Sequence, residues 1–120
     1  MSYVDGFVIP VAKDKIEDYR KMAETGKLVW MDHGALDYKE CVLEDEATNE
    51  HCGSFPQRVE HKENETIVFS YIVFKDRAHR DEVNAKVMAD PRLQEGCDGN
   101  NMPFDPKRMA YSGFKAIVEN

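Results

Sequence analysis

Two segments of the chain, 3–11 and 66–74, carry apolar residues on both of their alternating faces. A strand that faces water on one side alternates between apolar and polar residues, whereas a strand covered on both sides does not. In the first segment Phe7 and Val8 point to opposite faces, and in the second only Ser70 interrupts a run of Ile, Val, Phe and Tyr. Both segments therefore predict strands of a sheet that has apolar cover on each face, and the second belongs in the middle of that sheet.

A segment with helical periodicity follows each of these strands. Between 14 and 33, apolar residues recur at three- and four-residue steps, and Gly34 supplies a left-handed stop. A second helix is expected over 76–90, with Asp76 as its N-cap and Pro91 marking its end.

The remaining segments complete two similar halves. Residues 36–44 and 109–118 read as strands, and the polar, Gly- and Pro-containing stretches 44–62 and 96–106 read as loops. The order strand, helix, strand, strand, helix, strand predicts an α+β fold of the ferredoxin-like βαββαβ type. We expect one domain over 1–120, with a four-stranded antiparallel sheet and both helices on one face.

The apolar second face of this sheet predicts a partner. Two helices cover only one face of four strands, so the other face needs a different cover. We expect the same sheet from a second chain, which makes the protein a homodimer. The alternative is that the loops at 44–62 and 96–106 fold over this face, although both are polar.

The charge balance narrows the possible partners and the compartment. Asp and Glu number 23 against 16 Lys and Arg, which gives a formal net charge of −7 with no basic block. Binding to nucleic acid or to anionic lipid needs clustered Lys and Arg, so we expect neither partner. No apolar run approaches the roughly 20 residues that span a bilayer, the N-terminus does not resemble a signal peptide, and three widely spaced cysteines favour free thiols. We predict a cytoplasmic protein.

Three stretches of the sequence are similar to one family of bacterial proteins. They are His33-Gly34-Ala35-Leu36-Asp37-Tyr38; Phe69-Ser70-Tyr71 through Arg77-Ala78-His79-Arg80-Asp81 to Asp90-Pro91-Arg92; and Met102-Pro103-Phe104-Asp105 with Lys107-Arg108-Met109. On these motifs the chain resembles the YbaA-like family of uncharacterised proteins, which is grouped with the dimeric α+β barrel superfamily. The likeness runs from about Tyr3 to Ile117, and Ser112-Gly113 stands where such relatives usually have two glycines.

This resemblance implies a fold and a dimer, and it implies no reaction. The superfamily includes cofactor-free quinone-forming monooxygenases, haem-degrading enzymes and stress-response proteins, so the fold leaves the chemistry open. We expect no cofactor. Haem binding is a third possibility, and it would need an axial ligand, which only His33 or His79 is placed to offer.

We predict a mostly apolar pocket between the sheet and the helices. Such a pocket suits a small aromatic or quinone-like molecule, with cofactor-free oxygenase-type chemistry. The alternative is a non-catalytic structural or stress-related binding module in which the same aromatic residues are core. The predicted lining residues are Trp30, His33, Tyr38, Phe69, Tyr71 and Phe114, with Arg80 near the start of the second helix.

Two residues are candidates for acid–base catalysis. His33 ends the first helix beside the predicted pocket and could serve as a general base, or its cation could be favoured by the helix dipole. Glu40 shares a strand face with apolar neighbours, where a carboxylate is desolvated and suited to proton transfer, unless it is paired or exposed. Asp5 and Lys115, on neighbouring strands, could form a cross-strand pair.

Other polar clusters carry weaker predictions. Arg77, His79, Arg80 and Asp81 crowd the start of the second helix, where they could hold a small anion or form a solvated first turn. We expect no metal site, because His51, Cys52 and His61 lack paired ligand spacing.

Overall fold

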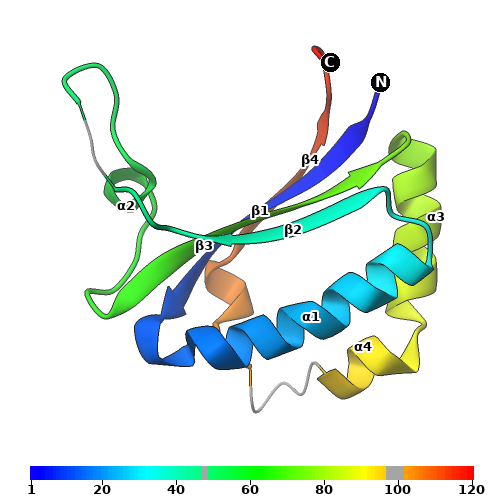
Figure 1. Ribbon diagram of the computed structural model, residues 1–120, viewed down its shortest axis with the longest axis horizontal. Helices are drawn as coiled ribbons and strands as arrows, with labels where there is room; N and C mark the ends of the chain where they lie inside the picture. Colours follow the sequence, from blue (N-terminus) through cyan, green and yellow to red (C-terminus); the bar gives the residue numbers. More distant parts are fainter. Residues whose placement is uncertain (47–48, 97–101) are drawn as a thin grey trace.

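A computed structural model of the chain describes residues 1–46, 49–96 and 102–120 (Figure 1). It confirms the predicted order of strands and long helices and adds short helices in the connections. The elements are β1 (Tyr3–Ala12), η1 (Lys13–Lys15), α1 (Ile16–Asp32), β2 (Asp37–Val42), α2 (Phe55–Arg58), β3 (Glu65–Phe74), α3 (Arg77–Met88), α4 (Pro91–Gly96), η2 (Pro106–Arg108) and β4 (Ala110–Lys115).

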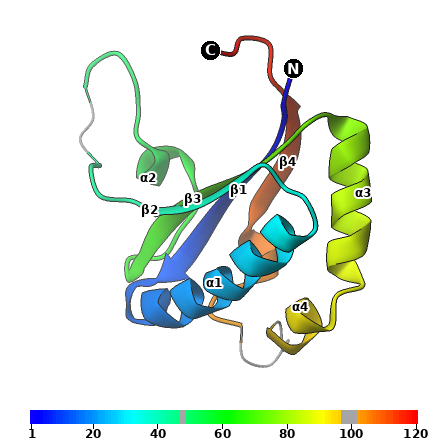
Figure 2. The same ribbon diagram turned by 45° about the vertical axis from the view of Figure 1, so that its right-hand side comes forward.

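The four strands form one antiparallel sheet in the order β2-β3-β1-β4. Helices α1 and α3 both lie against the same face of this sheet, with α4 next to α1 (Figures 1 and 2). The predicted ferredoxin-like α+β fold is therefore confirmed for the single chain.

The pairing of β1 with β3 divides their side chains between the two faces of the sheet. Phe7 lies opposite Ser70 and Ile9 opposite Val68, and both pairs face the helices. The core beneath the helices has two clusters of buried residues. One contains Val29, Ala35, Ile72, Phe74, Val83 and Val87, and the other contains Ile9, Val11, Tyr19, Ala23 and Val68.

The helix ends follow the expected local chemistry. The Asp76 carboxylate accepts a hydrogen bond from the His79 backbone N–H at 2.8 Å and so caps α3. After α1, Gly34 takes a φ of 112°, the left-handed conformation that glycine adopts without strain. None of the described helices is long and apolar enough to cross a membrane.

A short helix, α2, lies within the stretch predicted to be a loop. Ser54 and Gln57 form a reciprocal capping box, in which each side chain accepts a hydrogen bond from the other's backbone N–H. The sequence contained this signal, because a serine followed three residues later by glutamine is a helix start. Parts of the two predicted loops, at 47–48 and 97–101, lie outside the described residues, as does Cys97.

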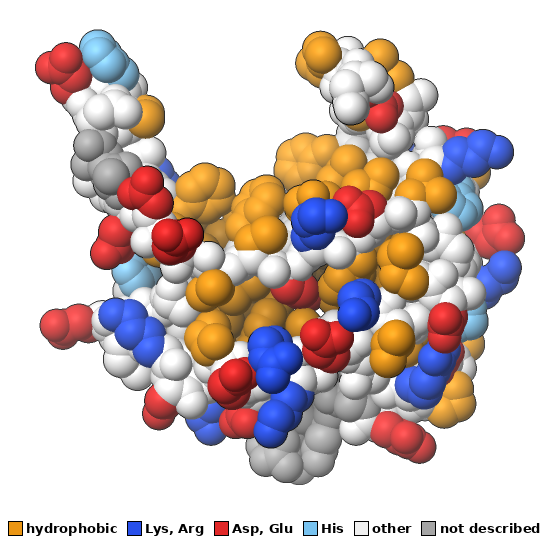
Figure 3. Space-filling view, viewed as in Figure 1, with side chains coloured by type: hydrophobic (Ala, Val, Ile, Leu, Met, Phe, Trp, Pro, Cys, Tyr) orange, Lys and Arg blue, Asp and Glu red, His pale blue; other side chains and the backbone are white. Residues whose placement is uncertain are grey.

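The sheet face opposite the helices is open. The side chains of Phe69 and Phe114 on this face are 42% and 57% exposed. Phe55 of α2 meets the edge of Phe69, with ring centroids 5.9 Å apart, and is itself half exposed. Figure 3 shows hydrophobic side chains gathered over the sheet between two projecting parts of the chain, and Figure 1 places α2 and the C-terminus on either side of it.

An ion pair holds the segment before β4 against the start of β3. Two nitrogens of the Arg108 guanidinium donate to the Glu65 carboxylate at 2.6 and 2.7 Å, and the Glu65 side chain is only 8% exposed. The hydrogen bonds from Arg108 lower the pKa of Glu65 to about 2.

We expect Glu65→Gln to lower the free energy of unfolding at pH 7 by about 1.5–3 kcal/mol, the usual contribution of a hydrogen bond to a charged group. Because the pKa of Glu65 is lowered by folding, its stabilisation is complete above about pH 5 and is lost as the pH falls toward 2. Urea unfolding should therefore show a larger difference from the unsubstituted protein at pH 7 than at pH 3. Glu63→Gln, at an exposed position, is the control. An equal loss at both pH values would contradict this assignment.

Candidate functional site

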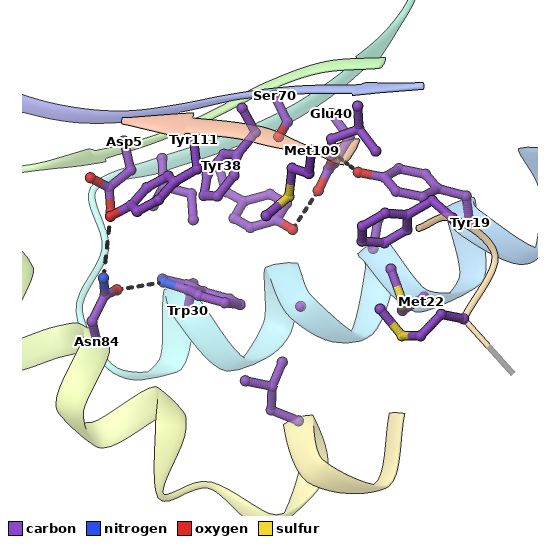
Figure 4. A pocket seen from close by; sticks show the side chains of 18 of the residues that line it. Asp5, Tyr19, Met22, Trp30, Tyr38, Glu40, Ser70, Asn84, Met109 and Tyr111 are labelled. Carbon is purple, nitrogen blue, oxygen red and sulfur yellow. Dashed lines mark hydrogen bonds between the residues drawn. The ribbon is translucent and has the colours of Figure 1, made fainter. Parts of the chain in front are cut away.

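A cavity of about 720 Å³ lies between the sheet and the helices α1, α3 and α4 (Figure 4). Most of its walls are apolar or aromatic, including Phe7, Trp30 and Phe104. Its polar lining residues come from both layers: Asp5, Tyr19, Tyr38, Glu40, Ser70, Asn84, Gln94 and Tyr111. A second hollow of about 330 Å³, between β2 and α1, shares Glu40 and both of its tyrosine neighbours.

At one end of the cavity, Glu40 lies between two tyrosines. The Tyr19 hydroxyl donates to Oε1 of Glu40 and the Tyr38 hydroxyl donates to Oε2, each at 2.6 Å. Burial, and then the neighbouring carboxylate, raise the pKa of Tyr19 well above its ordinary value. Gly26 of α1 leaves room for this arrangement, because a Cβ at that position would lie 3.0 Å from the Tyr38 hydroxyl oxygen.

Ser70 lies next to Glu40 on the central strand β3. The two residues are paired across β2 and β3, so their side chains share the face that looks into the cavity. Ser70 is 4% exposed, and its side chain takes no part in any hydrogen bond found among the described residues. Figure 4 shows its hydroxyl directed from the sheet toward the cavity.

At the other end of the cavity, the buried carboxylate of Asp5 is 1% exposed and is held by two donors. Nη1 of Arg80 donates to Oδ1 of Asp5 at 2.8 Å, and Nδ2 of Asn84 donates to Oδ2 at 3.4 Å. The indole nitrogen of Trp30 then donates to Oδ1 of Asn84 at 3.0 Å. Arg80 also donates to the hydroxyl of Tyr111 at 2.8 Å, and burial, followed by Asp5, raises the pKa of that phenol.

The structure brings some of the sequence candidates together and separates others. Trp30, Tyr38 and Glu40 line the cavity as a group. His33 lies outside it: Nε2 of His33 is 2.8 Å from Oδ2 of Asp90, in the turn that joins α3 to α4. The hydrogen bonds from Arg92, and then from His33, lower the pKa of Asp90.

The inclusion of Phe69, Tyr71 and Phe114 in this pocket is corrected by the strand pairing. Phe69 and Tyr71 flank Ser70 on β3, and successive residues of a strand point to opposite faces. Because Ser70 faces the cavity, its two neighbours face the open side of the sheet. Phe114 is paired with Val4 and lies over Gly6 on that same open side.

Arg80 and Asp5 have partners other than those expected. Arg80 was expected either to help hold an anion or to belong to a solvated first turn, but its guanidinium is bonded to Asp5, Asp81 and Tyr111. The expected pair between Asp5 and Lys115 is also wrong, because the register places Asp5 opposite Gly113.

Four site residues were missed by the sequence reasoning: Tyr19, Ser70, Asn84 and Tyr111. Tyr19 had a signal in its place on the inward face of the first helix, and Ser70 in being the polar residue of an apolar strand. Asn84 and Tyr111 had none. Across residues 1–46, 49–96 and 102–120, no three His, Cys, Asp or Glu side chains are grouped as metal ligands.

Comparison with known sequences finds relatives over the whole chain. A family described as a protein of unknown function (DUF1428) matches residues 2–106. The uncharacterised protein YbaA of Escherichia coli strain K12 is 42% identical over 119 residues, which is 99% of each chain. The uncharacterised protein YbaA of Shigella flexneri matches at the same identity and coverage.

Comparison with solved structures finds the same fold at low identity. A point mutant of SnoaB, a cofactor-independent oxygenase from Streptomyces nogalater, aligns with a TM-score of 0.59 at 12% identity, over 98% of this chain and 95% of that one. A NIPSNAP family protein of unknown function from Agrobacterium tumefaciens gives 0.58 at 18% identity, over 96% and 87%. These likenesses show the fold alone.

We expect Arg80→Met to lower the free energy of unfolding by about 3–5 kcal/mol, because it leaves the Asp5 carboxylate buried without its cation. Arg77→Met, at an exposed position of the same helix, is the matched control and should have little effect. The double variant Asp5→Asn, Arg80→Met should recover part of the loss. Chemical denaturation followed by circular dichroism measures all three variants. An Arg80→Met variant as stable as Arg77→Met would show that the pair does not stabilise the fold.

Proposed function

This chain belongs to the DUF1428 family, and we propose that it binds a small aromatic molecule between the sheet and the helices and acts on it by cofactor-free oxygenase-type chemistry. The observation that carries the proposal is the Glu40 carboxylate at one end of a largely apolar cavity. The volume of about 720 Å³ is typical of a small-molecule site. The fold shared with SnoaB is compatible with the proposal and does not establish it.

Glu40 is suited to accept a proton from a bound ligand. Both of its oxygens already receive a tyrosine hydrogen bond, which fixes the orientation of the carboxylate in the cavity wall. The hollow on the far side of Glu40 gives the proton a route toward solvent. Loss of a proton makes an aromatic ring electron-rich, so the ligand itself can reduce O2. The O–O bond breaks, one oxygen atom bonds to a ring carbon that loses its hydrogen, and the other oxygen takes the two hydrogens lost by the ligand and leaves as water.

The same contacts also favour a second candidate function. Because Tyr19 and Tyr38 both donate to Glu40, the three residues could instead form a structural network in the wall of a non-catalytic binding module. In that case the cavity binds its ligand without consuming oxygen.

Oxygen uptake separates the two functions. With a panel of two-ring and three-ring aromatic compounds, we expect at least one to raise the melting temperature and to be oxidised, with uptake recorded at an oxygen electrode. Glu40→Gln should lower the oxidation rate by about 10²-fold or more, the typical contribution of a general base. Glu17→Gln, at an exposed position of α1, is the control and should leave the rate unchanged. Stabilisation without uptake would support the binding module, and no stabilising compound would contradict both functions.

We further propose that the protein is a homodimer in which the open face of each sheet covers the other. The face carries Val4, Val8, Phe69, Tyr71 and Phe114, an apolar surface that the described parts of the chain leave largely open apart from the contact of Phe55 with Phe69. The helix α2 and the C-terminus project on either side of it, which leaves room between them for a second sheet (Figures 1 and 3). Packing two sheets face to face about a twofold axis buries the apolar surface of both copies. We also retain the predicted cytoplasmic location, which suits the free thiols of Cys41 and Cys52.

Light scattering on a sizing column tests the dimer. At a protein concentration on the order of 50 μM, which is usual for such a measurement, we expect a mass of twice 13.8 kDa. Phe69→Lys places a charge in the middle of the open face and should give a monomer. Leu28→Lys, on α1 and 56% exposed, is the matched control and should remain a dimer. A monomer of the unsubstituted protein would contradict the proposal.

A further inference from the structure

Resting on the proposed function, we infer that the cavity selects an uncharged aromatic ring that carries a hydroxyl group, and that it discriminates against quinones and aromatic anions. The inference comes from the balance of hydrogen-bond donors and acceptors around Glu40 and Ser70, and from the charges at the two ends of the cavity.

The Glu40 end offers mainly acceptors to a ligand. The hydroxyl protons of Tyr19 and Tyr38 are already donated to Glu40, so neither phenol has a proton left to donate to a ligand. The carboxylate has no proton to give while it is ionised, and each of its oxygens retains a further lone pair. A ligand group placed here must therefore donate a hydrogen bond.

Ser70 supplies the complementary donor. Ser70 is 4% exposed and is paired with Glu40 across β2 and β3. Its hydroxyl makes no hydrogen bond found among the described residues. Because Ser70 lines the cavity and its hydroxyl can donate, it is available to a ligand that brings an acceptor. A ligand hydroxyl satisfies both residues at once, because its O–H donates to Glu40 while its oxygen accepts from Ser70.

A quinone can form a hydrogen bond with only one of the two residues, Ser70 but not Glu40. Its carbonyl oxygen can accept from Ser70, but it then brings its lone pairs against the carboxylate of Glu40. A site built to hydrogen-bond an O–H rejects the analogue that lacks the proton, because its buried polar groups are left unpaired.

The charges of the lining disfavour anions. Two carboxylates, Glu40 and Asp5, belong to the cavity wall. Among the described residues, the guanidinium that contacts this wall is that of Arg80, and it is bonded to Asp5. Asp5 on β1 and Glu40 on β2 are separated by β3, where Asp5 is paired with Ile72 and Glu40 with Ser70. Two strand spacings and an offset of two residues along the strand put their Cα atoms about 12 Å apart. The apolar stretch between these ends takes the body of the ring system, and an added negative charge finds no unpaired cation among the described lining groups.

This selectivity fits the direction of the proposed reaction. A hydroxyarene with a hydrogen on the ring carbon para to its hydroxyl reacts with O2 to give a quinone and water. The O–H and the para C–H bonds break, one oxygen atom becomes the second carbonyl, and the other takes both hydrogens as water, so that O2 accepts four electrons. The product has lost the proton that Glu40 binds, and its weaker binding favours release.

Calorimetric titration without oxygen tests the inference with four naphthalene compounds. We expect 1-naphthol to bind at least about tenfold more tightly than 1-methoxynaphthalene, which has no proton to donate, a difference of about 1.4 kcal/mol. It should also bind more tightly than 2,3-dimethyl-1,4-naphthoquinone, whose substituted ring is protected from thiols, and than 1-naphthoate. Ser70→Ala and Glu40→Gln should each reduce the preference for naphthol over its ether, whereas Ser112→Ala on the open face should not.

The outcomes distinguish this inference from the proposed function. Equal affinities for 1-naphthol and its ether, or tighter binding of the quinone or the naphthoate, would overturn the selectivity and leave an aromatic-binding cavity in place. Binding of none of the four compounds would count against the cavity as an aromatic site and so against both. A preference for naphthol that survives in both Ser70→Ala and Glu40→Gln, with their folding verified by circular dichroism, would show that other residues read the hydroxyl.

Discussion

The antiparallel pairing of β1 with β3 is the constraint on which the rest of the molecule depends. It places Phe7 opposite Ser70 and Val8 opposite Phe69, and so assigns every residue of the two central strands to one face or the other. The helix-covered face thereby receives the cavity and the buried Asp5, and the opposite face receives the exposed aromatic surface. A shift of one residue in this pairing would exchange the two faces of one strand.

The two ends of the cavity use different means to keep polar groups in an apolar setting. Asp5 is neutralised by Arg80 and oriented by Asn84, which is itself fixed by Trp30. Glu40 has no cation bonded to it among the described residues and relies on two phenols. The charge of Asp5 is already engaged by Arg80, whereas that of Glu40 is not, and this difference makes Glu40 rather than Asp5 the candidate for proton transfer.

The sequence was sufficient for the fold because strand and helix periodicities are local properties. It identified Glu40, Trp30 and Tyr38 because each sits in a strongly periodic segment. Alternation along β3 also contained the information that Phe69 and Ser70 face opposite ways, but the face that holds the cavity depends on which side the helices cover. The partner of Asp5 depends on a contact between β1 and α3. Asp5 and Arg80 are 75 residues apart in the sequence, so no local pattern indicates that they pair.

The strand order has a consequence for how the chain reaches this structure during synthesis. β1 is made first, yet both of its neighbours come later, because it pairs with β3 and with β4, the last strand. Its apolar residues therefore have no strand to join until β3 has left the ribosome, and one of its edges stays open until β4 follows. Such long-range pairing slows folding and leaves apolar strands with unpaired edges exposed to other chains, which favours aggregation. The α1–β2 segment can collapse early, but closure of the sheet, and with it the formation of the cavity, must wait until β4 has been made.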